Sequence, residues 1–155
     1  MNSSKDQIAN FNSDGVDRLN VGAVLFDENN RVLLCQRSKT KKIAPGAWHL
    51  PGGKVETGES IEMAIIRELK EETNLDVDLI LGLTGVSHDY VVGEEKHRTV
   101  FVCVSASGNI ILNHENERYA FVAIEEVENF LEPELVKIYK DAIEAGLKML
   151  ASSKS

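Results

Sequence analysis

The sequence predicts an α+β fold in which a mixed β-sheet is flanked by two principal helices. Apolar and β-branched segments recur between residues 18 and 124 and are typical of strands. Residues 60–73, and the residues that follow Pro133, instead carry apolar side chains at helical spacing. The length of 155 residues suits one compact domain with a substantial core.

The elements can be placed in order along the chain. Residues 1–17 are polar and lack a clear period, so we expect a flexible N-terminal arm followed by a single domain over 18–151. The segments "RLNVGAVLFD" and "RVLLCQR" flank the turn "ENN" and predict a β-hairpin. A loop over 38–53 follows, with Trp48 and Leu50 as anchors. Further strands are predicted at about 75–87, 97–105 and 118–124, then a short acidic turn or helix at "EEVENF".

Charge and composition exclude several classes of function. A net charge of −8 argues against binding to nucleic acid, and it suits a small anionic substrate only if a metal cation mediates the contact. Cys35 and Cys103 lie in apolar runs and are expected to be buried, reduced thiols. The chain has no apolar stretch of about 18 residues and no signal-peptide pattern, so we expect a soluble, cytoplasmic protein without a membrane partner. A homodimer is compatible with the sequence.

The predicted helix at 60–73 has an unusual inward face. At about 100° per residue, one third of its circumference holds Ile61, Ala64, Ile65, Glu68 and Glu72, with Glu71 at the edge. Acidic side chains at this spacing repel one another, and near a helix C-terminus they also oppose the helix dipole. A solvated helix end would explain them poorly. A hard divalent cation such as Mg²⁺, which prefers carboxylate oxygens, explains them better.

The same residues resemble a known signature. The spacing matches the box of the Nudix hydrolases, which in words is G-x5-E-x7-R-E-U-x-E-E-x-G-U with U apolar. The matching residues are Gly53, Glu59, Arg67, Glu68, Leu69, Glu71, Glu72 and Leu75. The preceding "WHLPGG" and the order of the predicted strands are also similar to the family, over about residues 20–130. The resemblance implies the Nudix-type α/β/α sandwich.

One box position departs from the family. Asn74 stands where the family has glycine, at the point where the helix closes. A left-handed residue is commonly needed there, and Asn is the next-best residue after Gly. We therefore expect the turn to survive at a small cost in stability, with no ligand removed.

The resemblance also implies roles for the residues of the box. Family members hydrolyse a nucleoside diphosphate linked to another group, using Mg²⁺ or Mn²⁺. By position, the implied metal ligands are Glu68, Glu71, Glu72 and the backbone carbonyl of Gly52. Arg67 would hold Glu68 through a charge-assisted hydrogen bond, and Glu59 would support the junction between loop and helix. Glu68 or a carboxylate from a loop would act as the base, and the sequence leaves that choice open.

Residues outside the box have two interpretations each. Arg37 matches a position where the family often has an arginine facing substrate, and Lys41, Lys42 and Lys54 either attract a polyanion or are simply solvated. Glu115 and Glu117 are either a further metal ligand or base, or solvated loop acids. The candidates for a nucleobase pocket, with the hydrophobic core as the alternative, are His88, Tyr90, His97 and Phe121.

The sequence thus predicts a Mg²⁺-dependent, MutT-like Nudix pyrophosphohydrolase. Its expected substrate is a nucleoside triphosphate, cleaved to a nucleoside monophosphate and pyrophosphate. A nucleotide-sugar or dinucleoside-polyphosphate hydrolase is the alternative, and the position of Tyr90 beyond the box suggests the latter. A non-catalytic binding module of the same fold is disfavoured, because such modules commonly lose box acids and this chain keeps them.

Overall fold

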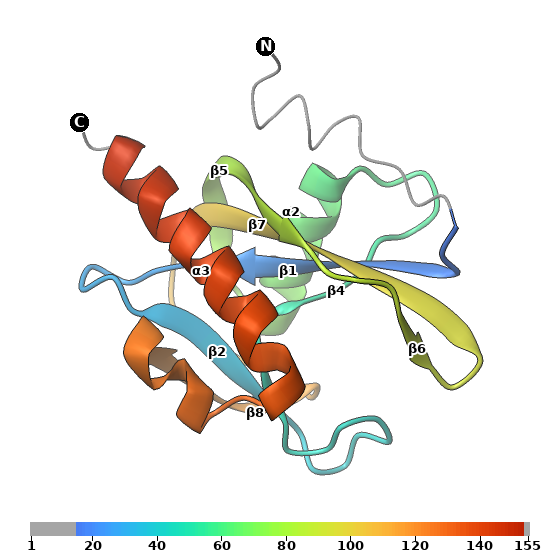
Figure 1. Ribbon diagram of the computed structural model, residues 1–155. Coiled ribbons are helices and arrows are strands. Elements are labelled where there is room, and N and C mark those ends of the chain that lie inside the picture. Colours follow the sequence, from blue (N-terminus) through green and yellow to red (C-terminus); the bar gives the residue numbers. More distant parts are fainter. Residues whose placement is uncertain (1–14, 154–155) are drawn as a thin grey trace.

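The structure is a computed structural model that describes residues 15–153 and contains two β-sheets packed with helices (Figure 1). Of the arm expected over 1–17, residues 1–14 lie outside the described range. The strands are β1 (Arg18–Val24), β2 (Val32–Arg37), β3 (Trp48–His49), β4 (Gly52–Lys54), β5 (Asp76–Val86), β6 (Tyr90–Val92), β7 (Glu95–Ser107) and β8 (Asn116–Val122). The helices are α2 (Ile61–Thr73), the 3-10 helix η1 (Ile124–Asn129) and α3 (Pro133–Ser153).

The larger sheet has five strands and is mixed, as predicted. Its main path is β4-β1-β7-β5, and β6 pairs with the first residues of β7. Strands β1 and β7 run parallel, whereas the other pairs in this sheet are antiparallel. The smaller sheet is antiparallel, with the order β3-β2-β8.

The predicted hairpin of β1 and β2 is wrong beyond its turn. The two strands lie in different sheets, and within the described residues they are joined near the turn by a bridge between Phe26 and Val32 and by one hydrogen bond from Leu33 to Leu25. Most positions of both strands are buried, on the two faces alike. Each strand is therefore surrounded by other elements, and a two-stranded ribbon with one wet face would not bury these side chains.

The other predicted elements are found close to their expected positions. The strands predicted at 75–87, 97–105 and 118–124 correspond to β5, β7 and β8, and "EEVENF" forms most of η1. The loop over 38–53 contains the short strands β3 and β4, which the sequence did not indicate. Its anchors behave as expected, because Leu50 is buried and the ring of Trp48 packs edge-on against Phe130 with centroids 5.2 Å apart.

The two principal helices cover opposite faces of the larger sheet (Figure 1). Buried residues of α2 such as Ile65 and Leu69 pack with Val21 and Val102 in one core. The other core contains Ile143 of α3 and extends to β2 and η1. This layering of helix, sheet and helix is the α/β/α arrangement.

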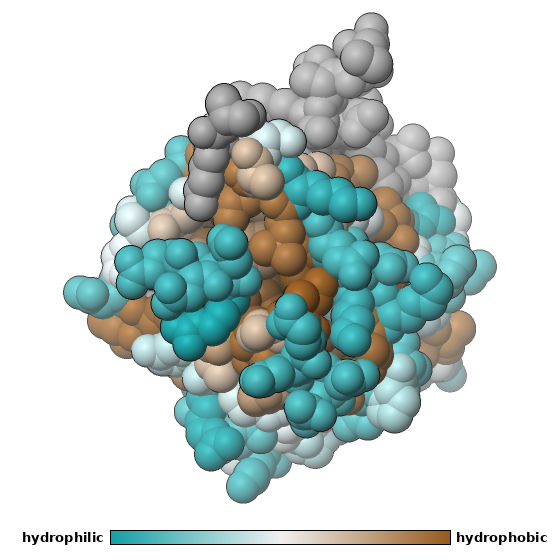
Figure 2. Space-filling model, turned by 60° about the vertical axis from the view of Figure 1, so that its left-hand side comes forward, coloured by the Kyte–Doolittle hydropathy of each residue, from teal (hydrophilic) through white to brown (hydrophobic). Residues whose placement is uncertain are grey.

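Both cysteines are buried free thiols, as predicted. On the face shown in Figure 2, apolar surface forms a central band bordered by hydrophilic side chains. Neither long helix among residues 15–153 combines the length and the apolar character needed to cross a lipid bilayer.

Candidate functional site

Helix α2 is closed at both ends by residues suited to those positions. The Ser60 hydroxyl accepts a hydrogen bond from the N–H of Met63 at 3.1 Å and caps the first turn. Asn74 ends the helix with φ of 67°, in the left-handed conformation expected for this position. Its N–H donates to the carbonyl of Lys70, and its side-chain amide donates to the carbonyl of Asn109. The expectation that asparagine preserves this turn is confirmed.

The inward face of α2 changes from apolar to acidic along the helix, as its periodicity predicts. Ile61, Ala64 and Ile65 are buried in the first turns. Glu68 and Glu72 continue this face and are only 8% and 2% exposed. Glu71 lies at the edge and is exposed, so two of the three adjacent carboxylates are held away from bulk water.

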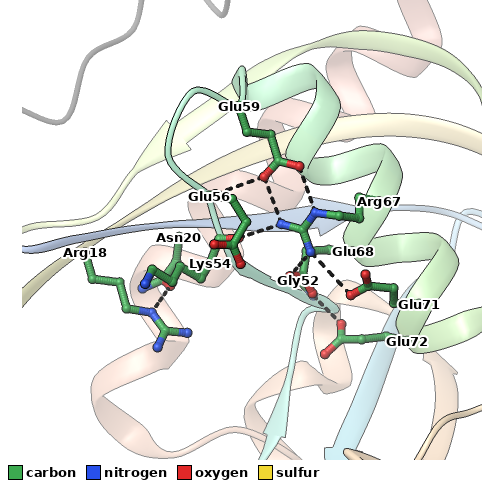
Figure 3. A network of polar contacts seen from close by, with 10 residues as sticks. All are labelled: Arg18, Asn20, Gly52, Lys54, Glu56, Glu59, Arg67, Glu68, Glu71 and Glu72. Atoms are coloured by element: carbon green, nitrogen blue, oxygen red, sulfur yellow. Dashed lines mark hydrogen bonds and ion pairs between the residues drawn. The ribbon is translucent and has the colours of Figure 1, made fainter.

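Arg67 connects these acids to the preceding loop (Figure 3). Its Nε and Nη2 donate to the two oxygens of Glu59 at 2.7 and 2.8 Å, a bidentate pair. Nη1 donates to Glu68 at 2.8 Å and to Glu71 at 3.3 Å, while Nη2 also donates to the carbonyl of Lys54 at 2.8 Å. Because Glu59 also accepts the N–H of Glu56, the loop and the helix are held together by one guanidinium group.

Two consecutive glycines allow β4 to lie directly against the acidic end of α2. A Cβ atom on Gly53 would lie 2.5–2.7 Å from the carboxylate atoms of Glu68. A Cβ atom on Gly52 would collide with the backbone carbonyl of Val21. The N–H of Gly52 donates to Glu72 at 2.7 Å, so the backbone of β4 fixes this buried carboxyl group.

The acids of the site differ in their electrostatic environments. The hydrogen bonds from Arg67 lower the pKa of Glu59 and raise that of the guanidinium itself. Burial raises the pKa of Glu68, although Arg67 opposes the effect. Burial raises the pKa of Glu72 to about 9, with further contributions from the charges of Glu68 and Glu115. Without a cation, these surroundings therefore favour the protonated form of the Glu72 carboxyl group.

A groove of about 670 Å³ joins this acidic end to a basic loop. Glu72 and Glu115 line one part of it, close enough for Glu115 to raise the pKa of Glu72. Arg37, Lys41 and Lys42 line another part, where Nε of Arg37 donates to the carbonyl of Ile43 at 2.9 Å. A polyanion in the groove would therefore contact the three cationic side chains directly. Its contact with the carboxylates would need a cation between them.

A polar network from β1, β6 and β7 lines a further part of the groove. Asn20 accepts a hydrogen bond from Nε of Arg18 at 2.7 Å (Figure 3), and its amide nitrogen lies 3.3 Å from the Tyr90 hydroxyl. The Tyr90 hydroxyl lies 2.9 Å from the hydroxyl of Thr99, and its ring packs against His97 with centroids 5.5 Å apart. This region presents an aromatic face and amide and hydroxyl groups, which suit a nucleobase or a sugar.

The structure brings most of the predicted site residues together, but not all of them. Lys54 is exposed and does not line the groove, but its backbone carbonyl accepts a hydrogen bond from Arg67. Glu117 contributes to a separate shallow pocket beside Trp48. His88 and Phe121 are also absent from the groove lining, and Phe121 packs against the core that contains α2.

Several polar residues that line the groove were not predicted from the sequence, among them Arg18, Asn20, His49 and Thr99. Asn20 offers a signal, because it is a polar residue within the otherwise apolar run "LNVGAV". The other three have no comparable pattern around them. They meet because β1 pairs with β7 and β2 pairs with β3, which are contacts between distant segments.

Comparison with known families decides the identity of this arrangement. The family model for the NUDIX domain matches residues 16–145, which include α2, β4 and every residue that lines the groove. The chain belongs to the NUDIX family. As a NUDIX protein it is a hydrolase that acts on phosphoric anhydride bonds.

Individual relatives agree with the family assignment. The NUDIX chain is 34% identical over 113 residues to nucleoside triphosphatase NudI of Salmonella paratyphi B, an alignment that covers 66% of this chain and 80% of that protein. The MutT NUDIX hydrolase of Burkholderia pseudomallei has a similar structure, with a TM-score of 0.65 and 26% identity over 83% of this chain and 96% of that one. The fold also resembles that of an Ap4A hydrolase from C. elegans, with a TM-score of 0.64 and 20% identity over 87% of this chain and 98% of that one.

NUDIX hydrolases generally use divalent metal ions, and the donor atoms of this site suit such an ion. Among residues 15–153, no three His, Cys, Asp or Glu side chains converge as a preformed metal cluster, and the carboxylates of Glu68 and Glu72 accept hydrogen bonds from Arg67 and from the N–H of Gly52. The candidate donors are nevertheless all hard oxygens. Burial and the charges of Glu68 and Glu115 raise the pKa of Glu72, and a divalent cation would supply a positive charge that favours its ionised form.

Proposed function

We propose that this NUDIX protein is a Mg²⁺-dependent pyrophosphohydrolase that cleaves a nucleoside triphosphate to a nucleoside monophosphate and pyrophosphate. The observation that carries the proposal is the groove itself, which joins Glu72 and Glu115 to Arg37 and to the polar network around Tyr90. A nucleotide needs these three environments, one for the metal, one for phosphate and one for the nucleoside. The similarity to a nucleoside triphosphatase supports the choice of substrate.

The metal would be held by Glu68, Glu71, Glu72, Glu115 and the carbonyl oxygen of Gly52. When bound, it would neutralise negative charge on the phosphate oxygens and would make a water molecule a better nucleophile. Mg²⁺ is the preferred ion because these donors are all oxygens, and Mn²⁺ is the expected substitute.

The residues of the chain perform the remaining tasks. Arg37, Lys41 and Lys42 bind the phosphate oxygens, and Arg67 holds Glu68 in its ionised form. A carboxylate oxygen of Glu68 or Glu115 accepts a proton from the attacking water as the water oxygen bonds to phosphorus. The anhydride bond breaks at the same phosphorus, and the nucleoside monophosphate and pyrophosphate are released.

A hydrolysis screen tests the proposal. The purified chain is incubated with Mg²⁺ and nucleoside triphosphates, oxidised triphosphates, nucleotide sugars or dinucleoside polyphosphates, and the products are identified. Reaction in ¹⁸O-labelled water identifies the attacked phosphorus, because the label appears in only one product. We expect a labelled monophosphate or labelled pyrophosphate from a triphosphate, and no turnover after chelation of the metal. Absence of hydrolysis with every substrate would contradict the enzyme assignment.

Glu72→Gln is the variant that tests the metal site. We expect the rate to fall by at least about 100-fold, because a metal contributes several kcal/mol to the stabilisation of the transition state. Glu62→Gln is the matched control, since Glu62 lies on the same helix, is half-buried and does not line the groove. Equal activity of the two variants would contradict the assignment of Glu72 as a ligand.

A dinucleoside polyphosphate is the second candidate substrate, and the position of Tyr90 favours it. The residue lines the groove and is 40% exposed, so its ring is available to stack on a second base. The screen separates the candidates by their products. A triphosphate yields pyrophosphate, a dinucleoside polyphosphate yields two nucleotides, and a nucleotide sugar yields a sugar phosphate.

A further inference from the structure

The segment that carries Glu115 is irregular, yet it is tied to the site at several points. It precedes β8, and its backbone meets the end of β2. The hydroxyl of Ser38 donates to the carbonyl of His114 at 2.7 Å, and the N–H of Ser38 donates to the carbonyl of Glu115 at 2.9 Å. The N–H of Glu115 donates to the side chain of Asn113 at 3.0 Å. The Ser38 side-chain bond is exposed, so competition with water limits what it contributes to holding this segment.

A buried anchor directly follows Glu115. Asn116 is 3% exposed, and its side-chain oxygen lies 2.8 Å from Nε2 of His49. Nδ1 of His49 lies 2.8 Å from the carbonyl oxygen of Leu50. These contacts connect the start of β8 to the short segment that leads into Gly52.

The pairing works with either form of the imidazole. The carbonyl of Leu50 can only accept, so Nδ1 of His49 carries a hydrogen and donates. Nε2 then donates to the Asn116 oxygen if the ring is charged, or accepts from the Asn116 nitrogen, after a half-turn of the amide, if the ring is neutral. In the orientation of the structure the amide nitrogen of Asn116 is buried and has no partner among the described residues. A buried amide nitrogen without a partner lowers stability, so the hydrogen bond to His49 is the main polar contact that holds the Asn116 side chain in place.

Glu115 needs such an anchor because of what it faces. Both side chains line the same groove, and the charge of Glu115 is one of the factors that raise the pKa of Glu72. When both groups are ionised to serve a metal, the repulsion between them would push an irregular segment away from α2. The bond between Asn116 and His49 opposes this movement from the buried side, one residue away.

We propose that His49 and Asn116 form a positioning pair that holds the carboxylate of Glu115 beside Glu72. Neither residue touches the reacting atoms, and both act through Glu115. The inference rests on the proposed function, because it assigns Glu115 to the carboxylate set that serves the metal. A purely structural anchor for β8 is the competing explanation.

Coupling between variants distinguishes the two explanations. Asn116→Ala is expected to lower kcat by about 10–100-fold, as is typical of residues that orient metal ligands. KM should change by no more than about threefold, because substrate contacts remain. In a Glu115→Gln background, Asn116→Ala should have no further effect on kcat. Asn129→Ala is the matched control, since Asn129 is exposed on η1. If the double variant instead shows a loss of kcat equal to the product of the two single losses, the proposal is overturned.

A second measurement does not depend on turnover. Binding of Mn²⁺ to the protein without substrate, followed by electron paramagnetic resonance, should weaken by about tenfold in Asn116→Ala and by the same factor in Glu115→Gln. His49→Gln keeps one donor and one acceptor, so it should retain part of the affinity and serves if Asn116→Ala does not fold. Unchanged Mn²⁺ affinity with a lowered Tm would overturn the proposal and leave only a structural role. If the wild type binds Mn²⁺ but hydrolyses no nucleotide, the proposed function fails while this measurement still tests the pair.

Discussion

Gly53 shows how a single absent side chain shapes the site. The strand β4 approaches α2 so closely that even a methyl group at this position would overlap the carboxylate of Glu68. The box glycine is therefore required by packing against a functional acid. Its backbone conformation does not require glycine, because its φ lies outside the left-handed range.

Gly53→Ala should consequently damage the site more than the fold. The added methyl displaces Glu68, so we expect kcat to fall by about 10–100-fold, as for a misplaced metal ligand. Gly85→Ala is the matched control, because Gly85 also lies in a strand and its added Cβ would meet neighbours only at 3.8 Å or more. Steady-state kinetics and thermal unfolding of both variants check the expectation. Equal kcat values for the two variants would show that Glu68 tolerates the displacement.

Arg67 has a role that another cation does not replace. Its guanidinium bonds Glu59, Glu68, Glu71 and the carbonyl of Lys54 together. Lysine offers a point charge without this planar fork, so Arg67→Lys should lower kcat by about 10–100-fold and stability by about 1–2 kcal/mol. Arg31→Lys provides the comparison, because the exposed pair of Arg31 with Asp27 should be worth less than about 1 kcal/mol. Urea unfolding that gives the same loss for both variants would contradict this account.

At the scale of the element, α2 is the part of the molecule that the sequence predicts best. Its periodicity places Glu68 and Glu72 on the buried face and Glu71 at its edge, which is what the structure shows. Strands β3 and β4 are too short to be recognised locally, and two of the three residues of β4 are glycine. The hairpin prediction failed because the choice of partner for β1 depends on β7, far away in sequence. The meeting of Glu115 with Glu72 depends on the same kind of distant contact.

The end of α2 offers a test of the exchange of glycine for asparagine. Asn74 adopts the left-handed conformation, in which alanine costs about 1–2 kcal/mol more than glycine. We expect Asn74→Ala to lower the free energy of unfolding by about 1 kcal/mol, whereas Asn74→Gly should be close to neutral. Urea denaturation measures both values, and kcat should change little because Asn74 donates no ligand. A loss for glycine as large as the loss for alanine would mean that the bond from Asn74 to Asn109, which both variants lack, outweighs the backbone conformation.

At the scale of the whole molecule, the two sheets bring opposite charges to one groove in a chain whose net charge is −8. The loop after β2 supplies Arg37 and Lys41, and α2 and the segment before β8 supply carboxylates. Composition alone excluded a polyanion as a direct partner, and only the fold shows where cationic residues are concentrated. A divalent cation held by these carboxylates would offset their mutual repulsion and favour the binding of a phosphate group nearby.

This arrangement predicts that metal binding and protonation compete. The pKa of Glu72 is raised to about 9 in the metal-free fold, so at neutral pH a proton must leave before the carboxylate can bind a cation. A raised pKa favours the fold below the ordinary value of 4.5, and this contribution is lost as the pH rises toward 9. Mg²⁺ should therefore raise the Tm more at pH 9 than at pH 6, and calorimetry in buffers of different ionisation enthalpy should detect release of a proton on binding at pH 7. Glu72→Gln should abolish the pH dependence of the Mg²⁺ effect, since glutamine does not titrate. Identical Mg²⁺-induced Tm shifts at pH 6 and pH 9 in the wild type would show that Glu72 is already ionised, or that it does not bind the metal.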